Sequence, residues 1–302
     1  MTTQPCPIPL VCPSCKGPLE SDPDRWRCAA CGAVYGYAGG FPDLIVGERF
    51  EDASDETLLR YEEHSNAHLA ENYWIPLFRR LWPGLDRPRI LSCGCGTGMD
   101  VDLLAGAGFD IVGIDCGNRT QVWPRRAHPE RLLLANGKNL PFRDQTFDGA
   151  FCGCVFPHVG VLGDSNRVGP HFKAERLSLA REMARVLKPG GKIVVASPNR
   201  WFPFDIFHGR RPGSYKPRWN WPGNPFLLSL ADYRDLFRQA GCGAAETLPI
   251  NRYWGFVRSQ NSLKGLLLGL PVRFVFWLVS LNALRCLRAS PINPWLIVLI
   301  TK

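Results

Sequence analysis

The chain has 302 residues, which is enough for one α/β domain with a full core and a small accessory module. With 45% hydrophobic and 21% charged residues, its composition is ordinary for a soluble globular protein. The 36 Lys and Arg residues outnumber the 27 Asp and Glu residues, so the net charge is +9. That charge suits nucleic acid, an acidic membrane surface or a phosphorylated substrate, but it also fits a basic protein without such a partner.

The N-terminal segment MTTQPCPIPL lacks the basic and apolar regions of a signal peptide, so we expect a cytoplasmic protein. Twelve cysteines in that setting indicate reduced thiols and metal ligands rather than a disulfide framework. The most hydrophobic stretch, 266–281, has 16 residues and contains Pro271 and Arg273. A spanning helix needs about 20 apolar residues, so we do not expect this stretch to cross a membrane.

Three parts are expected along the chain: a module rich in Cys, Gly and Pro over 1–46, a helical linker over 47–84, and an α/β domain over 85–302. The linker predicts one helix over 50–82, which Pro83-Gly84 ends. In the domain, strands are predicted over 89–93, 109–115, 131–136, 146–154, 192–198 and 294–300, and helices over 99–108, 172–187 and 231–241. Strands that alternate with helices predict a doubly wound, mostly parallel sheet.

Two long insertions interrupt this pattern. Residues 199–225 are rich in aromatic residues and proline, which is typical of a lid or binding loop. Residues 252–289 form an apolar block just before the last strand. The block is expected either to cover the substrate pocket or a dimer surface, or to lie in a membrane interface with its arginines on anionic lipid.

Four cysteines of the N-terminal module have the spacing of a zinc site. CPSC and CAAC form two CxxC turns with 12 residues between them, and each turn directs two thiolates at one ion. Four thiolates leave no open position on zinc, so the predicted site is structural. The predicted ligands are Cys12, Cys15, Cys28 and Cys31. With the following VYGYAGGFPDLI, the module resembles the Trm112-like zinc ribbons, which implies either a docking module or a stability module.

The segment ILSCGCGTG places three glycines where a strand ends and a helix begins. Glycines let the backbone turn tightly, and the helix N-terminus can bind an anionic group. Nicotinamide enzymes use a similar loop, so the glycines alone are weak evidence. Asp115 ends the next strand, and a carboxylate there can accept both ribose hydroxyls of a nucleoside-type ligand.

Three motifs together resemble the class I S-adenosylmethionine methyltransferases of the UbiE-like, type 11 subgroup. They are ILSCGCGTG, NGKNLPFRDQTFDGAFCGCVFPHV and EMARVLKPGGKIVVASPN. The resemblance covers about residues 85–250 and implies a Rossmann-like fold and S-adenosylmethionine as cofactor. By position, it implies that Gly94, Gly96 and Gly98 line the methionine and ribose, and that Asn136, where the family usually has Asp, lies near the adenine with Gly137 beside it. Cys152 would lie beside the cofactor or fill the core.

Methyl transfer to a hydroxyl needs a proton acceptor, for which His is the usual residue near neutral pH. His158 follows the fourth strand and matches the second His of the family's LHHV motif, so it is a candidate base. Asp205 and His208 of the aromatic lid are further candidates. Cys93, Cys95, Cys116, Cys152 and Cys154 lie near strand ends; buried inert thiols are the favoured interpretation, and a second metal site or a redox switch is the alternative.

Three functions remain open at this point. The first is methylation of an O or C atom on a small, apolar or lipid-linked acceptor, with a possible peripheral membrane contact through 252–289. The second is RNA or protein methylation that uses the ribbon for recognition, although the loops typical of enzymes that methylate nucleic-acid bases are not visible. The third is a non-catalytic scaffold. The chain does not indicate whether it forms a homodimer.

Overall fold

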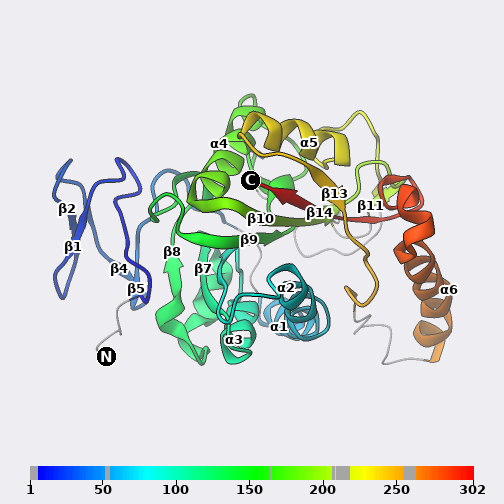
Figure 1. The fold of residues 1–302 in the computed structure, drawn as a ribbon, viewed down its shortest axis with the longest axis horizontal. Coiled ribbons are helices and arrows are strands. Elements are labelled where there is room, and N and C mark those ends of the chain that lie inside the picture. The colour runs from blue at the N-terminus through cyan, green and yellow to red at the C-terminus, as the bar shows by residue number, and fades with distance from the viewer. Residues whose placement is uncertain (1–5, 52–54, 164, 206–207, 209–217, 255–262) are drawn as a thin grey trace.

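The computed structural model describes residues 6–51, 55–163, 165–205, 208, 218–254 and 263–302, with backbone only for 263–268. A twisted central sheet separates two helical layers, and the N-terminal module lies beside one edge of the sheet (Figure 1). The parts of the predicted aromatic lid at 206–207 and 209–217, and of the apolar block at 255–262, lie outside the described residues.

The central sheet has seven strands in the order β13-β14-β10-β9-β6-β7-β8. Five neighbouring strands are parallel, and β14 runs antiparallel to both of its neighbours. The sheet is buried on both faces, which explains why its strands are continuous apolar runs. The strands are β6 (Arg89–Cys93), β7 (Asp110–Asp115), β8 (Leu132–Leu134), β9 (Phe147–Gly153), β10 (Leu187–Pro198), β13 (Ala245–Thr247) and β14 (Trp295–Thr301).

Alternate residues of each strand face opposite sides and divide the core into two clusters. On β6, Leu91 belongs to the cluster under α4 and α5, and Ile90 belongs to the cluster under α1–α3. In Figure 1 these two helical layers lie above and below the sheet. The helices are α1 (Glu56–Leu69), the π-helical turn η1 (Ala70–Trp74), α2 (Ile75–Leu81), α3 (Met99–Gly106), α4 (Phe172–Val186), α5 (Leu230–Gln239) and α6 (Leu263–Ser280).

Short elements complete the fold. The 3₁₀ turns are η2 (Asn118–Arg125), η3 (Pro129–Arg131), η4 (Gly137–Asn139), η5 (Phe156–His158) and η6 (Asn282–Ala289). The lid contains the two-stranded pair β11 (Phe204–Asp205) and β12 (Arg218–Trp219). The N-terminal module contains β1 (Leu19–Ser21), β2 (Trp26–Cys28) and β3 (Val34–Tyr35) in one sheet and the pair β4 (Tyr37–Ala38) and β5 (Phe41–Pro42).

The N-terminal module is attached to the edge of the central sheet. The amide of Leu44 donates to the carbonyl of Leu134, so the chain after β5 continues the sheet beyond β8. Further along, the amide of Phe50 donates to the carbonyl of Cys116, at the end of β7. Residues 43–50 therefore run across the carboxyl ends of β7 and β8, which is where a ligand binds in a sheet of this type.

Two predictions about local structure are wrong in detail. The single helix expected over 50–82 begins only at Glu56, where the Asp55 side chain accepts from the Leu58 amide, and η1 interrupts it. The segment 188–191, expected to be a turn after the helix, is already part of β10 and has a register shift against β9. Neither difference changes the predicted architecture, a doubly wound and mostly parallel sheet.

The apolar block forms α6 and η6. No single described helix is long and apolar enough to cross a membrane. The helix pair 269–280 and 282–289, which is bent by 109°, has the combined length and composition of a broken span. One face of α6 packs on the core through Phe276 and Val279. The opposite side exposes large apolar residues, among them Leu270, Phe274 and Trp277.

Candidate functional site

The loop between β6 and α3 has a backbone conformation that requires glycine at three positions. Gly94, Gly96 and Gly98 have φ values of 77°, 53° and 73°, in the left-handed region that other residues rarely adopt. A Cβ atom on Gly94 would lie 2.4 Å from Cγ2 of Val155, so this position has no room for a side chain. The amides of Gly94 and Cys95 donate to the carbonyl of Ile114, and the amide of Gly98 donates to the carbonyl of Cys95, so the loop is held tightly at the carboxyl edge of the sheet.

Asp115, at the end of β7, lies against this loop. One carboxylate oxygen accepts from the Gly96 amide over 2.7 Å, and the other accepts from the Gly117 amide over 2.8 Å. Burial raises the pKa of Asp115, and the hydrogen bonds from the two amides partly oppose that rise. A carboxylate has about four lone-pair positions, so Asp115 retains acceptor capacity for the hydroxyls of a ribose.

Helix α1 and the turn η2 are tied together around the loop. Arg119 donates to Glu62 over 2.5 Å, and Trp123 donates to the carbonyl of Gly96 over 2.8 Å. Burial, with the charge of Asp115, raises the pKa of Glu62 to about 8. These contacts place α1 over the glycine loop, where it can exclude water from a bound cofactor.

The other predicted cofactor residues lie in two different settings. The amide group of Asn136 donates to the carbonyl of Glu48 and accepts from the amide of Lys138, so its oxygen keeps one free lone pair. At Gly137, an added Cβ would lie 2.7 Å from the Leu179 side chain. Cys152 is buried in the core on the α4 side of the sheet, and burial raises the pKa of its thiol well above the usual value.

The three candidate catalytic residues come together, although they are far apart in sequence. The Nε2 atoms of His158 and His208 are 3.1 Å apart, and Nδ1 of His208 lies 3.1 Å from Oδ2 of Asp205. A fourth member is Cys154, which the sequence analysis named only as one of five thiols near strand ends: its Sγ atom is 3.4 Å from Nε2 of His208. Arg218 of β12 also donates to Asp205, over 2.6 Å.

The environment of this cluster shifts the pKa values of its two histidines in opposite directions. Burial and the neighbouring charge of His208 lower the pKa of His158 to about 3. Burial also disfavours a charged His208, but Cys154 and Asp205 outweigh it and raise the pKa of His208 to about 10. Asp205 is buried, yet its hydrogen bonds with His208 and Arg218 lower its pKa to about 2.

The four cysteines of the N-terminal module converge as predicted. The Sγ atoms of Cys12 and Cys31 are 3.7 Å apart, those of Cys15 and Cys28 are 3.4 Å apart, and all four lie within 4.8 Å of one another. Four sulfurs at about 2.3 Å from one zinc ion would be separated by roughly 3.8 Å, so this thiol set fits a tetrahedral ion.

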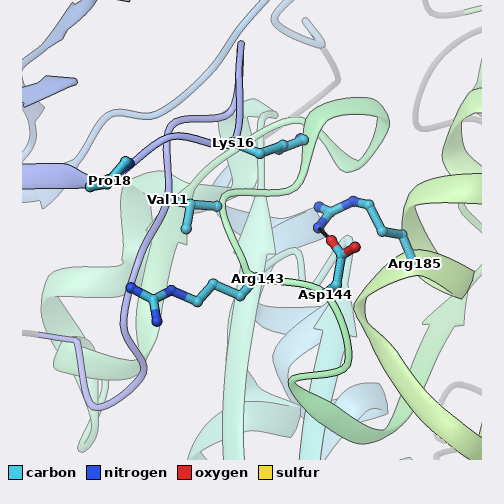
Figure 2. A pocket seen from close by; sticks show the side chains of 6 residues that line it. All are labelled: Val11, Lys16, Pro18, Arg143, Asp144 and Arg185. Atoms are coloured by element: carbon cyan, nitrogen blue, oxygen red, sulfur yellow. Dashed lines mark hydrogen bonds and ion pairs between the residues drawn. The ribbon is translucent and has the colours of Figure 1, made fainter. Parts of the chain in front are cut away.

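A pocket of about 280 Å³ lies between the N-terminal module and the central domain (Figure 2). Arg185 pairs with Asp144 over 2.7 Å at its rim, and Lys16 donates to Glu182 beside it. It is lined by Val11, Lys16, Pro18, Arg143, Asp144 and Arg185. Because Arg185 pairs with Asp144 and Lys16 of the module pairs with Glu182 of the domain, we interpret this pocket as part of the contact between module and domain.

Part of the chain is similar in sequence to known methyltransferases. Residues 91–195 match a family model described as a methyltransferase domain. A probable S-adenosylmethionine-dependent methyltransferase of Mycolicibacterium smegmatis is 26% identical over 189 residues, 60% of this chain and 63% of that protein. A demethylmenaquinone methyltransferase of Beutenbergia cavernae is 31% identical over 124 residues, 40% of this chain and 46% of that protein. The chain thus spans less than two thirds of either relative.

Among solved structures, an S-adenosylmethionine-dependent methyltransferase from Aquifex aeolicus aligns with 65% of this chain and 93% of its own, at 16% identity and a TM-score of 0.43. The sheet order and the glycine loop define the central domain as a Rossmann-like, class I methyltransferase fold. With the family match, residues 91–195 are an S-adenosylmethionine-dependent methyltransferase domain.

Proposed function

We propose that this chain transfers the methyl group of S-adenosylmethionine to an O or C atom of a small acceptor that is apolar or linked to a lipid. Gly94, Gly96 and Gly98 would hold the methionine and ribose parts of the cofactor, and Asp115 would accept from the ribose hydroxyls. The left-handed glycines and the half-buried carboxylate that accepts from the Gly96 amide support this placement.

The cofactor, when bound, supplies an activated methyl group that transfers by in-line displacement. The protein must then position the acceptor and exclude water. Cys154 and His158 follow β9 at the carboxyl edge of the sheet, and His208 joins them from the lid after β11. Val155, between Cys154 and His158, packs on Gly94. We place the acceptor atom at this cluster, with Asp205 as a positioning residue that holds His208 through Nδ1.

The main support for an apolar acceptor is the exposed face of α6. Leu270, Phe274 and Trp277 are 56%, 59% and 48% exposed, which is unusual for three large apolar side chains on one helix. On its other side α6 packs in the same core cluster as Trp295, which pairs with Pro198 at the carboxyl end of β10. The apolar face is therefore attached to the edge of the sheet at which the site lies.

The same face supports a peripheral contact with an anionic bilayer. Arg273 on the same helix and Arg285 on η6 are exposed, and the chain carries a net charge of +9. Apolar side chains that enter the headgroup region, together with arginines on anionic lipid, are the pattern of an interfacial helix. Such a contact would let a lipid-linked acceptor reach the site without leaving the membrane surface.

We also propose that Cys12, Cys15, Cys28 and Cys31 bind one structural zinc ion. The distances between their sulfur atoms support a closed tetrahedral site. Gly17 supports it further, because a Cβ there would lie 2.6 Å from the Ala30 Cβ and 3.3 Å from two of the sulfurs.

Transfer of a labelled methyl group tests the proposed acceptor. The full-length protein is incubated with methyl-labelled S-adenosylmethionine and cell extract, and the products are divided into lipid extract, RNA and protein. We expect label in the lipid extract, and much less of it with the Asp115→Ala variant, which should bind the cofactor more weakly. Label confined to RNA or to protein would contradict an apolar acceptor, and absence of both transfer and cofactor binding would indicate a non-catalytic scaffold.

A further inference from the structure

Three nitrogen and sulfur atoms converge beside the glycine loop in a way that the methyltransferase fold does not require. The ligand atoms of Cys154, His158 and His208 all lie within 4.8 Å of one another. Nε2 of His208 is 3.1 Å from Nε2 of His158 and 3.4 Å from Sγ of Cys154. Two ligands of a tetrahedral zinc ion, at about 2.0 Å for nitrogen and 2.3 Å for sulfur, are separated by roughly 3.3 to 3.5 Å.

His208 has the second interaction that metal-bound histidines usually make. Its Nδ1 atom lies 3.1 Å and 3.2 Å from the two oxygens of Asp205, and Arg218 holds the same carboxylate. A metal ion would displace the proton from Nε2 of the charged His208 ring, and the proton that remains on Nδ1 would be donated to Asp205. This carboxylate–histidine arrangement fixes the tautomer and orients the ring in zinc sites.

The backbone also directs Cys154 toward this point. Its φ of 57° is in the left-handed region, which is costly for a residue with a side chain and is often found at functional sites. The next residue, Val155, fills the space that Gly94 leaves open. The cluster is therefore held directly beside the loop that would bind the cofactor.

We propose that Cys154, His158 and His208 bind a divalent metal ion of the zinc class, with a fourth position open to a hydroxyl group of the methyl acceptor. Three protein ligands and one open position are the pattern of catalytic zinc, in contrast to the closed four-cysteine site. The proposal that these residues bind a metal is based on the geometry of the cluster alone, whereas the proposal that the fourth position binds the acceptor rests on the proposed function.

The metal would activate the acceptor oxygen. Binding to zinc lowers the pKa of a hydroxyl group, so its proton leaves to solvent and the oxygen becomes a stronger nucleophile. The oxygen–methyl bond then forms as the sulfur–methyl bond breaks, and the electron pair of that bond stays on sulfur. The acceptor at this site is accordingly an alcohol or phenol.

Metal content per chain tests the site independently of activity. Full-length protein is loaded with zinc, dialysed and analysed for metal and protein. We expect two zinc ions per chain in the unaltered protein, one in Cys154→Ser and in His208→Asn, and one in Cys28→Ser. The control His171→Ala removes an exposed histidine at the start of α4 and should retain both ions.

Cobalt distinguishes which ion has been lost. In the Cys28→Ser protein the remaining Co²⁺ should show the visible absorption of a four-coordinate site with sulfur, and the further change Cys154→Ser should abolish it. A single ion in the unaltered protein, or two ions in Cys154→Ser and His208→Asn, would overturn the proposal. Cofactor affinity is measured in every variant: if it persists while the second ion is absent from all proteins, the metal site fails and the methyltransferase function stands.

Discussion

The carboxylate of Asp115 accepts a hydrogen bond from the amide of Gly96 over 2.7 Å, across 19 residues of sequence. This bond joins the end of β7 to the loop that follows β6. The pair forms one side of the proposed cofactor site, and it depends on a left-handed φ at Gly96. The geometry of this hydrogen bond therefore depends both on the conformation of the glycine loop and on the position of Asp115 at the end of β7.

Gly94→Ala should both destabilise the protein and weaken cofactor binding. Its φ of 77° costs an alanine about 1–2 kcal/mol, and the new Cβ would lie 2.4 Å from Val155. We expect the free energy of unfolding, measured with urea, to fall by more than about 2 kcal/mol. Gly106→Ala, in helix α3 with no atom within 4 Å of the added Cβ, is the matched control and should be neutral or slightly stabilising. Equal losses in both variants would contradict the account.

Loss of a thiol ligand should unfold the N-terminal module. Cys28 is 1% exposed and belongs to the four-cysteine set, so Cys28→Ser should abolish one zinc ion and lower the unfolding temperature. Cys286→Ser removes an exposed thiol outside the set and should leave both quantities unchanged. A zinc content unaffected by Cys28→Ser would rule out the ribbon site.

The raised pKa of Asp100 should make the stability of the folded protein depend on pH. Burial, opposed in part by a hydrogen bond from Ser92, raises its pKa to about 6 in the folded protein, against an ordinary value of 3.8. The folded state therefore binds this proton more tightly, and stability is lost as pH rises from about 4 to 6. Asp100→Asn should remove that loss, so the variant gains up to about 3 kcal/mol relative to the unaltered protein over this interval. A difference between the two proteins that does not change with pH would show that Asp100 is not the cause.

Vesicle binding should depend on the exposed face of α6. Trp277→Gln and Phe274→Ser remove apolar area that we place in the headgroup region, so co-sedimentation with vesicles containing anionic phosphatidylglycerol should decrease. Val34→Ser changes an equally exposed apolar residue on β3 and should have no effect. Binding that is the same for all four proteins, or that does not require anionic lipid, would exclude this surface.

Much of the fold follows from local signals in the sequence. The buried strands are continuous apolar runs, and the glycine loop marks the change from strand to helix, so β6, β7, β9, β10 and β14 were predictable within a few residues. Two features of the fold were not predictable from local signals. Strand β13 has three residues, none of them buried, and it exists because β14 provides a partner. The contact of 43–50 with β7 and β8 is a long-range pairing that no local pattern indicates.

The candidate site shows the same division between local and long-range information. His158, Asp205 and His208 could each be named from the motif or from the lid, but their convergence depends on how the lid returns through β11 and β12. Cys154 was one of five thiols near strand ends. Its position four residues before His158 was an available signal. The left-handed backbone, the partial exposure and the contact with His208 distinguish it from a buried core thiol such as Cys152, and none of these can be read from the sequence.

Calorimetric titration of the zinc-loaded, full-length protein with S-adenosylmethionine tests the central claim most directly. We expect one binding site per chain, and an affinity roughly 10- to 100-fold lower for Asp115→Ala, the loss typical of a hydrogen bond to a charged group. Asp110→Asn, at the other end of the same strand, should bind the cofactor like the unaltered protein. Heat on addition of NAD, with none on addition of S-adenosylmethionine, would contradict the account.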